Sequence, residues 1–504
     1  MIFIEKYNDF KYGVVNAIDP SELPKEALYK SQNMQYKENR WRKIPGLTEV
    51  NPTQISSTNG VWGIGFHYDI ITKKRITLIY CGTDVFKLND DLSTTSIDSV
   101  MSLNSQLEFM SLPQFTYFGS QNDKWRRYDG GTQTYFIGAN NGDASDAPRK
   151  YIKILFNPFA GRYFAIGDPA NPDYLNWSAH IDDEGIEKWP GANVQITESV
   201  NGDVPLNFDM DNGRILLVSK HSINSGTVVG VPQNWNFQKE KSQTGTIAGR
   251  TLKRYGSFYL MLTPDFEVYK WPNDVFVTKG RVKFNINPYK AHLACAEITE
   301  NRYYDLCFES GEAVSSNKYH WWRYDILGDR WYGPSIQRNI VTMTKDPDKN
   351  FTLCGGVDDL SGYLMELRGL NIKNSQMKCH MITGYNFQGD INLDKRYTKV
   401  RVKAKQAGSL ASSQGQLEVT ANVDSWADAP QSQTLTLEDP ANENPMDTSA
   451  VRDAIIKRAH IHELYGRGSS IQLEFKHEQL NGELEISEWE IEGYMRTKKE
   501  ARSA

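Results

Sequence analysis

The sequence predicts an all-β protein, in which a β-propeller follows an N-terminal hairpin extension and precedes a C-terminal β-sandwich. The 504-residue chain is rich in Gly, Tyr, Phe and Trp, a composition that favours strands joined by many turns. Between residues 61 and 369, paired strands recur at roughly 40 to 50 residues, the spacing of propeller blades. After residue 369, polar and apolar residues alternate strictly, as in a sandwich. We therefore divide the chain into an extension (1–50), a propeller (51–375) and a sandwich (376–504).

The segment from residue 16 to residue 47 predicts a lead-in to a sheet. Residues 33–36 and 40–43 predict two short strands around a three-residue polar turn, Lys37-Glu38-Asn39. Pro45-Gly46 predicts a further turn directly after this hairpin. A generic edge hairpin would also account for these features.

In the central region, each repeat joins a strand to a second strand that carries an aromatic residue beside a charged one. Trp125-Arg126-Arg127-Tyr128-Asp129 and Trp321-Trp322-Arg323-Tyr324-Asp325 are the clearest internal match. A closed ring of blades buries both faces of each sheet and protects strand edges, whereas a large sandwich of unrelated hairpins is the alternative. Six or seven blades can be marked, and residues 207–249 are interpreted as a long excursion. The strand pairs are 76–80 with 84–88, 115–118 with 125–129, 163–166 with 175–177, 258–262 with 267–271, 303–307 with 322–325, and 351–354 with 362–367.

The C-terminal region predicts strands at residues 398–405, 417–423, 471–475 and 484–491. Leu484 and Ile486 share one phase of the last strand, and Trp489 and Ile491 take the other. This slip predicts a β-bulge near Ser487-Glu488. Residues 442–445 predict a loop, and residues 449–465 have weak helical spacing.

One face of the strand at 398–405 is basic and could contact DNA or an acidic neighbour. Glu483 and Glu485 could pair with it across the sheet, and a solvated strand face is the simpler alternative. The basic residues are Lys399, Arg401, Lys403 and Lys405.

Charge and cysteine content exclude some classes of function. A net charge of −5 argues against a broad basic surface that grips nucleic acid. Five cysteines without a Cys-x-x-Cys pair argue against a disulfide framework or a structural zinc site. The first residues do not form a signal peptide, and no stretch predicts a membrane span.

Candidate metal sites are weak. His460 and His462 would share a strand face, but two surface histidines are the commoner case. Asp182-Asp183-Glu184, near His180, could bind calcium, but a solvated loop is the simpler interpretation. Tyr324 and Trp331 are similar to the pair that braces a kelch repeat. Because nucleophile-elbow, phosphate-loop and zinc-protease motifs are absent, we expect no catalytic residue, metal or cofactor, and no enzyme.

The opening resembles that of the tail nozzle and tail hub proteins of short-tailed bacteriophages, also called packaged-DNA stabilisation proteins. Asn39 stands where that family often has glycine. Gly466-Arg467-Gly468, an alternating strand and then Leu484-Glu485-Ile486-Ser487 are similar to the family's ending. We assign to assembly the residues Asp19, Pro20, Leu23, Pro24, Asn33, Trp41, Arg42, Lys43, Pro45 and Gly46.

The resemblance implies a phage virion structural protein, assembled in the host bacterial cytoplasm. It implies a hexameric ring below the portal and adaptor, in contact with other tail proteins, whose lumen retains and then conducts double-stranded DNA without reading its sequence. We expect the propeller to fold without residues 19–47. The alternatives are a tail-tip or receptor protein that binds glycans and, more remotely, a kelch-like enzyme.

Overall fold

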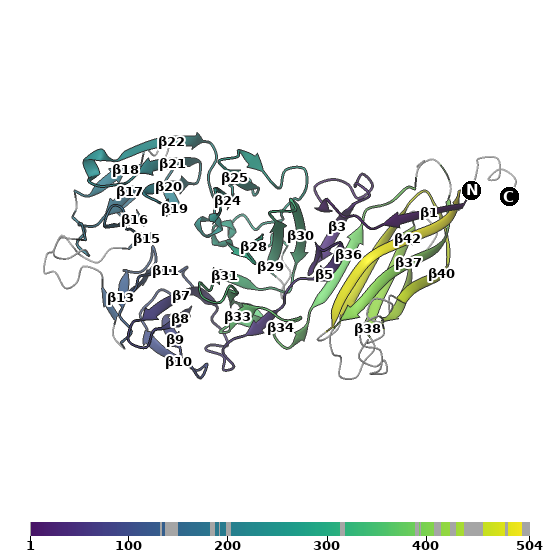
Figure 1. Ribbon diagram of the computed structural model, residues 1–504, viewed down its shortest axis with the longest axis horizontal. Coiled ribbons are helices and arrows are strands. Elements are labelled where there is room, and N and C mark those ends of the chain that lie inside the picture. The colour runs from purple at the N-terminus through teal and green to yellow at the C-terminus, as the bar shows by residue number, and fades with distance from the viewer. Residues whose placement is uncertain are drawn as a thin grey trace.

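The computed structural model describes residues 2–131, 134–136, 150–181, 187–190, 192–197, 203–312, 318–388, 393, 395–407, 415–423, 430–437, 457–478 and 482–495. It confirms an all-β protein, with a ring of blades at one end and a two-sheet sandwich at the other (Figure 1). No helix in these ranges is both long and apolar enough to cross a membrane.

Within the described residues, seven blades surround one axis. The first strand of each blade lies innermost, and β7 contacts both β11 and β31, which completes the circle. The blades are β7 (Val61–Asp69), β8 (Lys74–Cys81), β9 (Asp84–Leu88) and β10 (Thr94–Asp98); β11 (Glu108–Ser111), β12 (Thr116–Gly119), β13 (Arg126–Tyr128) and β14 (Thr134–Phe136); β15 (Lys153–Asn157), β16 (Arg162–Asp168), β17 (Asn171–Trp177) and β18 (Val194–Ile196); β19 (Pro205–Asp211), β20 (Arg214–Ser219), β21 (Ser222–Thr227) and β22 (Asn236–Ser242); β23 (Lys253–Tyr255), β24 (Phe258–Leu262), β25 (Val268–Trp271) and β26 (Val275–Phe276); β27 (Cys295–Thr299), β28 (Tyr303–Glu309), β29 (Tyr319–Asp325) and β30 (Arg330–Ser335); and β31 (Ile340–Lys345), β32 (Thr352–Gly356) and β33 (Leu364–Leu367) with β6 (Leu47–Glu49). Short 3-10 helices occur at η2 (Pro232–Asn234), η3 (Gly249–Thr251), η4 (Ala291–Leu293) and η5 (Asp358–Leu360).

The six sequence repeats fall on the second and third strands of six blades. The remaining blade, β19–β22, lies in the stretch interpreted as a long excursion, so that interpretation is wrong. Its third strand, β21, reads Ser-Ile-Asn-Ser-Gly-Thr and lacks the aromatic and charged residues that mark the other repeats. β21 is mostly buried by neighbouring strands, although its own sequence carries none of the features that marked the other repeats.

The N-terminal segment closes the ring. β6 pairs antiparallel with β33, with Leu47 opposite Leu367, and forms the fourth strand of the last blade. Leu47 is fully buried in a core with Trp321 and Ile340. Residues 19–47 therefore supply strands to the sandwich and end at Leu47, which lies in the folded propeller. That the propeller folds without them stays a prediction, against which the closing strand β6 argues.

The sandwich combines strands from both ends of the chain. Its facing sheets are held by contacts such as Phe475 against Trp489, with ring centroids 4.9 Å apart. The first sheet contains β3 (Ala27–Gln32), β36 (Lys378–Thr383), β41 (Ile471–Glu478), β38 (Gly415–Val423) and β39 (Gln431–Leu437). The second contains β1 (Ile2–Tyr7), β4 (Met34–Lys37), β5 (Arg40–Lys43), β42 (Glu483–Met495), β37 (Lys395–Ala407) and β40 (Lys457–Gly468), while β34 (Asn371–Ile372) and β35 (Ser375–Gln376) extend the last blade.

The propeller and the sandwich share one sheet and one core. The short strand β2 (Gly13–Val14) pairs in parallel with both β30 and β3, which joins a blade to the sandwich in a ten-stranded sheet. A single apolar cluster extends from Leu260 and Trp322 in the blades to Val400 in the sandwich. The N-terminal 50 residues thus contribute strands to both domains and are not a separate extension.

Three local expectations are resolved by strand register. Lys37 lies opposite Arg40, so the hairpin turn has two residues, not three; Glu38 and Asn39 have φ of 54° and 60°, as in a type I′ turn. The bulge is confirmed, because Lys403 faces Glu488 while the next residue, Ala404, faces Ile486. Residues 457–465, expected to show helical spacing, belong to strand β40 because they pair along β37. Residues 442–445 and 449–456 lie outside the described ranges.

We predict that Leu47→Ala lowers the free energy of unfolding by about 2–5 kcal/mol, because it leaves a cavity under the closing strand. Chemical denaturation followed by tryptophan fluorescence measures this change. Leu327→Ala is the control, since Leu327 is 69% exposed and its truncation creates no cavity. Equal stability of the two variants would show that β6 does not hold the ring closed.

Candidate functional site

The structure divides the predicted assembly residues into two groups. Asp19, Pro20, Leu23 and Pro24 belong to a turn near the surface, in which the Ser21 N–H donates to Asp19 at 2.8 Å. The carbonyl of Pro20 accepts the Tyr385 N–H at 2.9 Å, which attaches this turn to the sandwich. The second group, Asn33, Trp41, Arg42, Lys43, Pro45 and Gly46, lies where the last two blades meet the sandwich.

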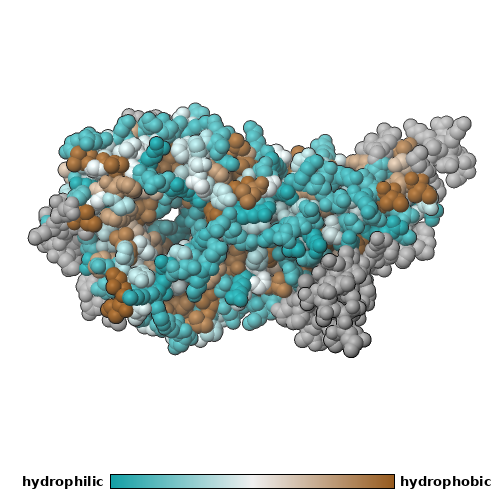
Figure 2. Space-filling view, in the orientation of Figure 1, coloured by the Kyte–Doolittle hydropathy of each residue, from teal (hydrophilic) through white to brown (hydrophobic). Residues whose placement is uncertain are grey.

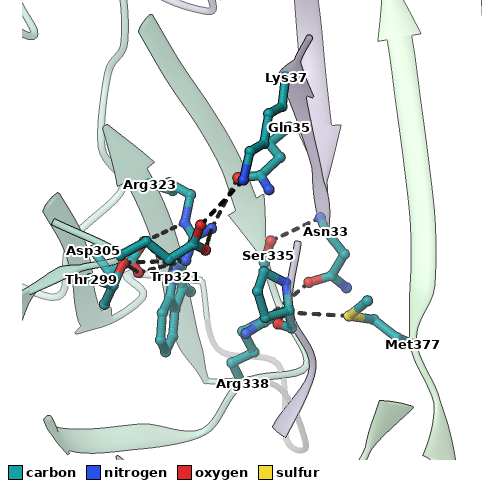
Figure 3. A network of polar contacts seen from close by, with 12 residues as sticks. Asn33, Gln35, Lys37, Thr299, Asp305, Trp321, Arg323, Ser335, Arg338 and Met377 are labelled. Carbon is teal, nitrogen blue, oxygen red and sulfur yellow. Dashed lines mark hydrogen bonds and ion pairs between the residues drawn. The ribbon is translucent and has the colours of Figure 1, made fainter. Parts of the chain in front are cut away.

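Asn33 links three parts of the molecule at this junction (Figure 3). Its backbone N–H donates to Ser335 Oγ at 2.9 Å, and its Nδ2 donates to the Lys378 carbonyl at 2.8 Å. Its Oδ1 accepts from Arg338 Nε at 3.2 Å. Asn33 is fully buried with φ of 56°, a conformation that Asn tolerates better than most residues.

Arg338 is a fully buried cation that binds residues 27–47, which we call the cassette. Its Nη2 donates to the Pro45 carbonyl at 2.6 Å, and its guanidinium lies 5.0 Å from the centroid of the Trp321 ring. Among the described residues, no carboxylate lies within ion-pair distance. Burial, followed by the charge of Arg323, lowers the pKa of Arg338 to about 10.

A buried ion pair lies beside Arg338. Arg323 donates to both carboxylate oxygens of Asp305 at 2.8 Å, and Asp305 also accepts from Trp321 Nε1 and Thr299 Oγ1. Arg323 Nη1 extends to Gln35 Oε1 at 2.9 Å and so connects a blade to β4 (Figure 3). Burial would lower the pKa of Arg323, but the charge and hydrogen bonds of Asp305 raise it.

The other cassette residues are also used inside the chain. Trp41 is fully buried and meets Tyr332 edge to face at 5.8 Å. Arg42 pairs with Glu485 at 2.9 Å. Gly46 lies so close to the Asn371 backbone that a side chain would clash with it.

Lys43 places a buried charge beside a buried histidine. Its Nζ has no hydrogen-bond partner among the described residues, and burial lowers its pKa. Burial, followed by the charge of Lys43, lowers the pKa of His477 to about 4. The Nδ1 of His477 lies 2.8 Å from the Gln416 carbonyl.

The basic strand face is matched by carboxylates on β42. Arg401 pairs with Glu492 at 2.7 Å and with Glu490 at 3.3 Å, and Lys403 lies 3.9 Å from Glu488. Lys399 lies opposite Glu492 and Lys405 opposite Glu485 in the β-ladder.

The strand register agrees with the prediction that Glu485 faces the basic strand, and the structure adds a second set of partners. Glu485 pairs with Arg40 and Arg42 of the hairpin, because β5 lies on the other side of β42. The face therefore alternates rows of opposite charge, and the acids paired with its described basic side chains are Glu488, Glu490 and Glu492.

The propeller axis holds a second, partly buried set of charges. Arg250, just before β23, donates to Glu108 at 2.6 Å and to the Trp62 carbonyl at 2.9 Å, so it links three blades across the axis. Burial would raise the pKa of Glu108, but Arg250 and Lys153 lower it overall. Lys253 pairs with Glu297 at 2.9 Å.

Two axial pockets, of about 410 and 140 Å³, share Glu108, Lys153, Asn207 and Arg250 in their walls, and Figure 2 shows a narrow opening at the centre of the ring. Burial raises the pKa of the Cys295 thiol in the smaller pocket to about 12. A protonated thiol is a poor nucleophile, and the charged groups around it bind one another. The axis is therefore lined by charged groups that pair with one another.

The remaining candidates have structural partners or lie outside the described ranges. Tyr324 stacks on Trp331 at 5.0 Å, as in a braced blade. In the described part of the chain, no cluster of three or more His, Cys, Asp or Glu could hold a metal ion. His460 and His462 lie on β40 opposite Arg401 and Lys399, and residues 182–184 lie outside the described ranges.

Sequence reasoning missed the central roles of Arg250, Asp305, Arg323 and Arg338. Arg323 lies inside the Trp-Trp-Arg-Tyr-Asp repeat, so the motif was visible, but its acidic partner comes from the neighbouring strand. Arg250 and Arg338 lie in segments between blades and carry no repeat signature.

Comparison with known proteins yields fold neighbours only. No protein-family model and no curated protein matches the chain. PorZ, a surface component of the type-IX secretion system of Porphyromonas gingivalis, is 10% identical with a TM-score of 0.38, and the match covers 69% of this chain and 44% of PorZ. The Neurospora crassa Pan2 WD40 domain is 10% identical (TM-score 0.38; 68% and 99% covered). Virginiamycin B lyase from Staphylococcus aureus is 13% identical (TM-score 0.39; 64% and 98% covered), and similarities of this size transfer no function.

We predict that Asn33→Ala destabilises the protein more than Asn33→Gly does. Both variants lose the side-chain hydrogen bonds, worth about 1–3 kcal/mol, but glycine accepts the positive φ and should recover about 0.5–1 kcal/mol. Asn104→Ala is the control. Asn104 is exposed and has φ of 53°, so this substitution introduces the unfavourable backbone conformation without the loss of buried hydrogen bonds. Chemical denaturation ranks the variants, and equal effects of Asn104→Ala and Asn33→Ala would contradict the buried role of Asn33.

We predict that His477 makes stability depend on pH below its ordinary pKa of 6.5. Its folded pKa is depressed, so its contribution is complete above pH 6.5 and is lost as pH falls towards about 4. The stability difference between wild type and His477→Asn should therefore shrink over this window, by up to about 3 kcal/mol. Denaturation curves at several pH values test this, and parallel curves would contradict it.

Proposed function

We propose that this chain is a virion structural protein of a short-tailed phage, the nozzle or hub subunit of its tail. The resemblance of residues 16–47 to that family supports the proposal. The observation that carries it furthest is the position of the cassette (residues 27–47). Its strand β6 closes the propeller, β3, β4 and β5 complete the sandwich, and the pairing of β3 with β2 joins the two in one sheet. A subunit joined in this way transmits force without bending at a linker.

In this proposal, copies of the chain form a hexameric ring below the portal and adaptor, in contact with other tail proteins. The lumen between copies retains packaged double-stranded DNA and then conducts it. The axial pockets of a single propeller are of small-molecule size, so DNA does not pass along the propeller axis. The net charge of −5 and the paired charges of β37 and β42 leave little excess positive charge to hold phosphates.

Ring contacts require surface that the fold leaves exposed, and the cassette side chains are mostly buried. β1 is an edge strand, since among the described strands it pairs with β42 alone. Ile2 and Ile4 are 60% and 58% exposed on it, and Tyr494, opposite Ile2, is 44% exposed. Figure 2 shows an apolar patch at this end of the molecule. We assign a contact between copies to this edge, which strand pairing would extend.

Two alternatives remain as functions of the whole chain. A tail-tip or receptor protein would bind glycans through the propeller, and the cleft described below favours this second function over an enzyme. A kelch-like enzyme would need a metal or a nucleophile, and the buried thiols of the described core are protonated.

We predict that the purified full-length protein forms closed rings in negative-stain electron microscopy at micromolar concentration. Ile4→Lys should abolish them, because it places a charge in the proposed contact. Ile71→Lys is the matched control, since Ile71 is 92% exposed on a propeller hairpin. Monomers in the presence of the phage adaptor would overturn the nozzle proposal, and rings that survive Ile4→Lys would place the contact elsewhere.

A further inference from the structure

A polar cleft of about 650 Å³ lies between the blades β19–β22 and β23–β26, and we propose that it is a carbohydrate-binding site. Its volume is that of a small-molecule site. Figure 1 shows β21 and β22 in the blade next to that of β24 and β25, and all four strands contribute residues to its walls. The inference is independent of ring assembly.

The cleft begins where the apolar packing between the two blades ends. The second strands of the two blades, β20 and β24, contribute Leu216, Val218 and Met261 to a buried cluster between them. Leu216 and Tyr259 belong both to this cluster and to the cleft wall. Further out, the facing residues of the first blade are polar, so the blades do not seal against each other.

The first wall is a row of hydrogen-bonding groups. Asn236, Gln238 and Glu240 alternate along β22 and share one exposed face, with Thr227 and Ser225 opposite on β21. Gln238 Nε2 donates to Glu240 at 2.6 Å, which orients both groups. The Asn236 side chain makes no hydrogen bond within the described part of the chain and is available to a ligand. Amides and carboxylates in one row suit a ligand with many hydroxyls.

The second wall is aromatic. Trp271 is partly exposed and packs on Tyr259, with ring centroids 6.0 Å apart. An indole offers a flat apolar surface with low conformational entropy. A sugar ring has an apolar C–H face and a rim of hydroxyls, so it can stack on Trp271 while its rim bonds to the opposite row.

The charges of the cleft favour a neutral ligand. Arg254 pairs with Asp211 at 2.5 Å at one end, and Arg214 and Glu240 add one charge of each sign. Two acids and two bases balance, whereas a phosphate or nucleic-acid site would carry excess positive charge. A peptide site would present apolar pockets at alternate positions, but the positions of β22 that line the cleft are polar.

The full-length protein should be screened on a printed array of bacterial surface polysaccharides and of neutral gluco-, manno- and galacto-oligosaccharides. Isothermal titration calorimetry then gives the affinity for each saccharide that binds. Trp271→Ala should weaken binding at least tenfold, and Asn236→Ala about threefold to tenfold through the loss of one or two hydrogen bonds. Asn236 is exposed, so its variant folds even if Trp271→Ala does not.

Tyr289→Ala is the matched control, because Tyr289 is 86% exposed and lies outside the cleft. It should leave saccharide binding unchanged, as should Ile4→Lys, which separates this test from that of ring assembly. A wild-type protein that binds no saccharide on the array overturns the proposal. Binding that survives both Trp271→Ala and Asn236→Ala overturns it as well.

Discussion

The antiparallel pairing of β6 with β33 is the constraint on which the rest of the structure depends. A ring of blades is stable only when its last sheet is complete, because an open blade leaves unpaired strand edges and an exposed apolar face. The final strand, β6, comes from the N-terminal side of the propeller. The residues that precede it therefore pass along the neighbouring blade, where β2 pairs with β30. That course places β3, β4 and β5 against the C-terminal strands and creates the sandwich.

Buried polar groups fix the course of the cassette. Apolar packing alone would tolerate small shifts in register, whereas the Asp305–Arg323 pair and Arg338 each require partners in defined positions. Arg338 has no neighbouring carboxylate among the described residues, so carbonyl and amide oxygens of the cassette compensate its burial. Such groups contribute little net stability when paired, but a misplaced cassette would leave them unsatisfied at a cost of several kcal/mol.

Local patterns made the strands predictable, but contacts between distant segments remained hidden. Aromatic residues beside charges identified the second and third strands of six blades, and the phase change at Ser487 identified a bulge, because both are properties of a few adjacent residues. β21 was missed because its sequence has no aromatic or charged residue, and its burial comes from contacts with neighbouring strands. The predicted hairpin turn was one residue longer than the observed turn at Glu38-Asn39, because the polar residues at this position are compatible with either length.

The site was less predictable than the fold for the same reason. Asn33 and Trp41 were singled out through a resemblance, and their contacts with Arg338 and Tyr332 lie about 300 positions away in the chain. Spacing within a segment cannot reveal such pairs. The pairing of the basic strand with the acidic last strand was predicted, but spacing did not reveal that Glu488, Glu490 and Glu492 are the acids that contact its described side chains. The strand pairs that close the ring and join the two domains connect residues far apart in the sequence.

The closure of the ring by β6 also determines when the last blade can be completed during synthesis of the chain. Leu47 emerges from the ribosome long before Leu367, its partner across the closing ladder. At about 5–20 residues per second, the early strand waits on the order of 15 to 60 s with its edge unpaired. β1 waits longer still, because its partner strand ends at Met495. A nascent chain of this design depends on chaperones or on fast blade-by-blade folding to keep those edges from aggregating, so its yield should respond to translation rate more strongly than that of a protein with local strand pairing.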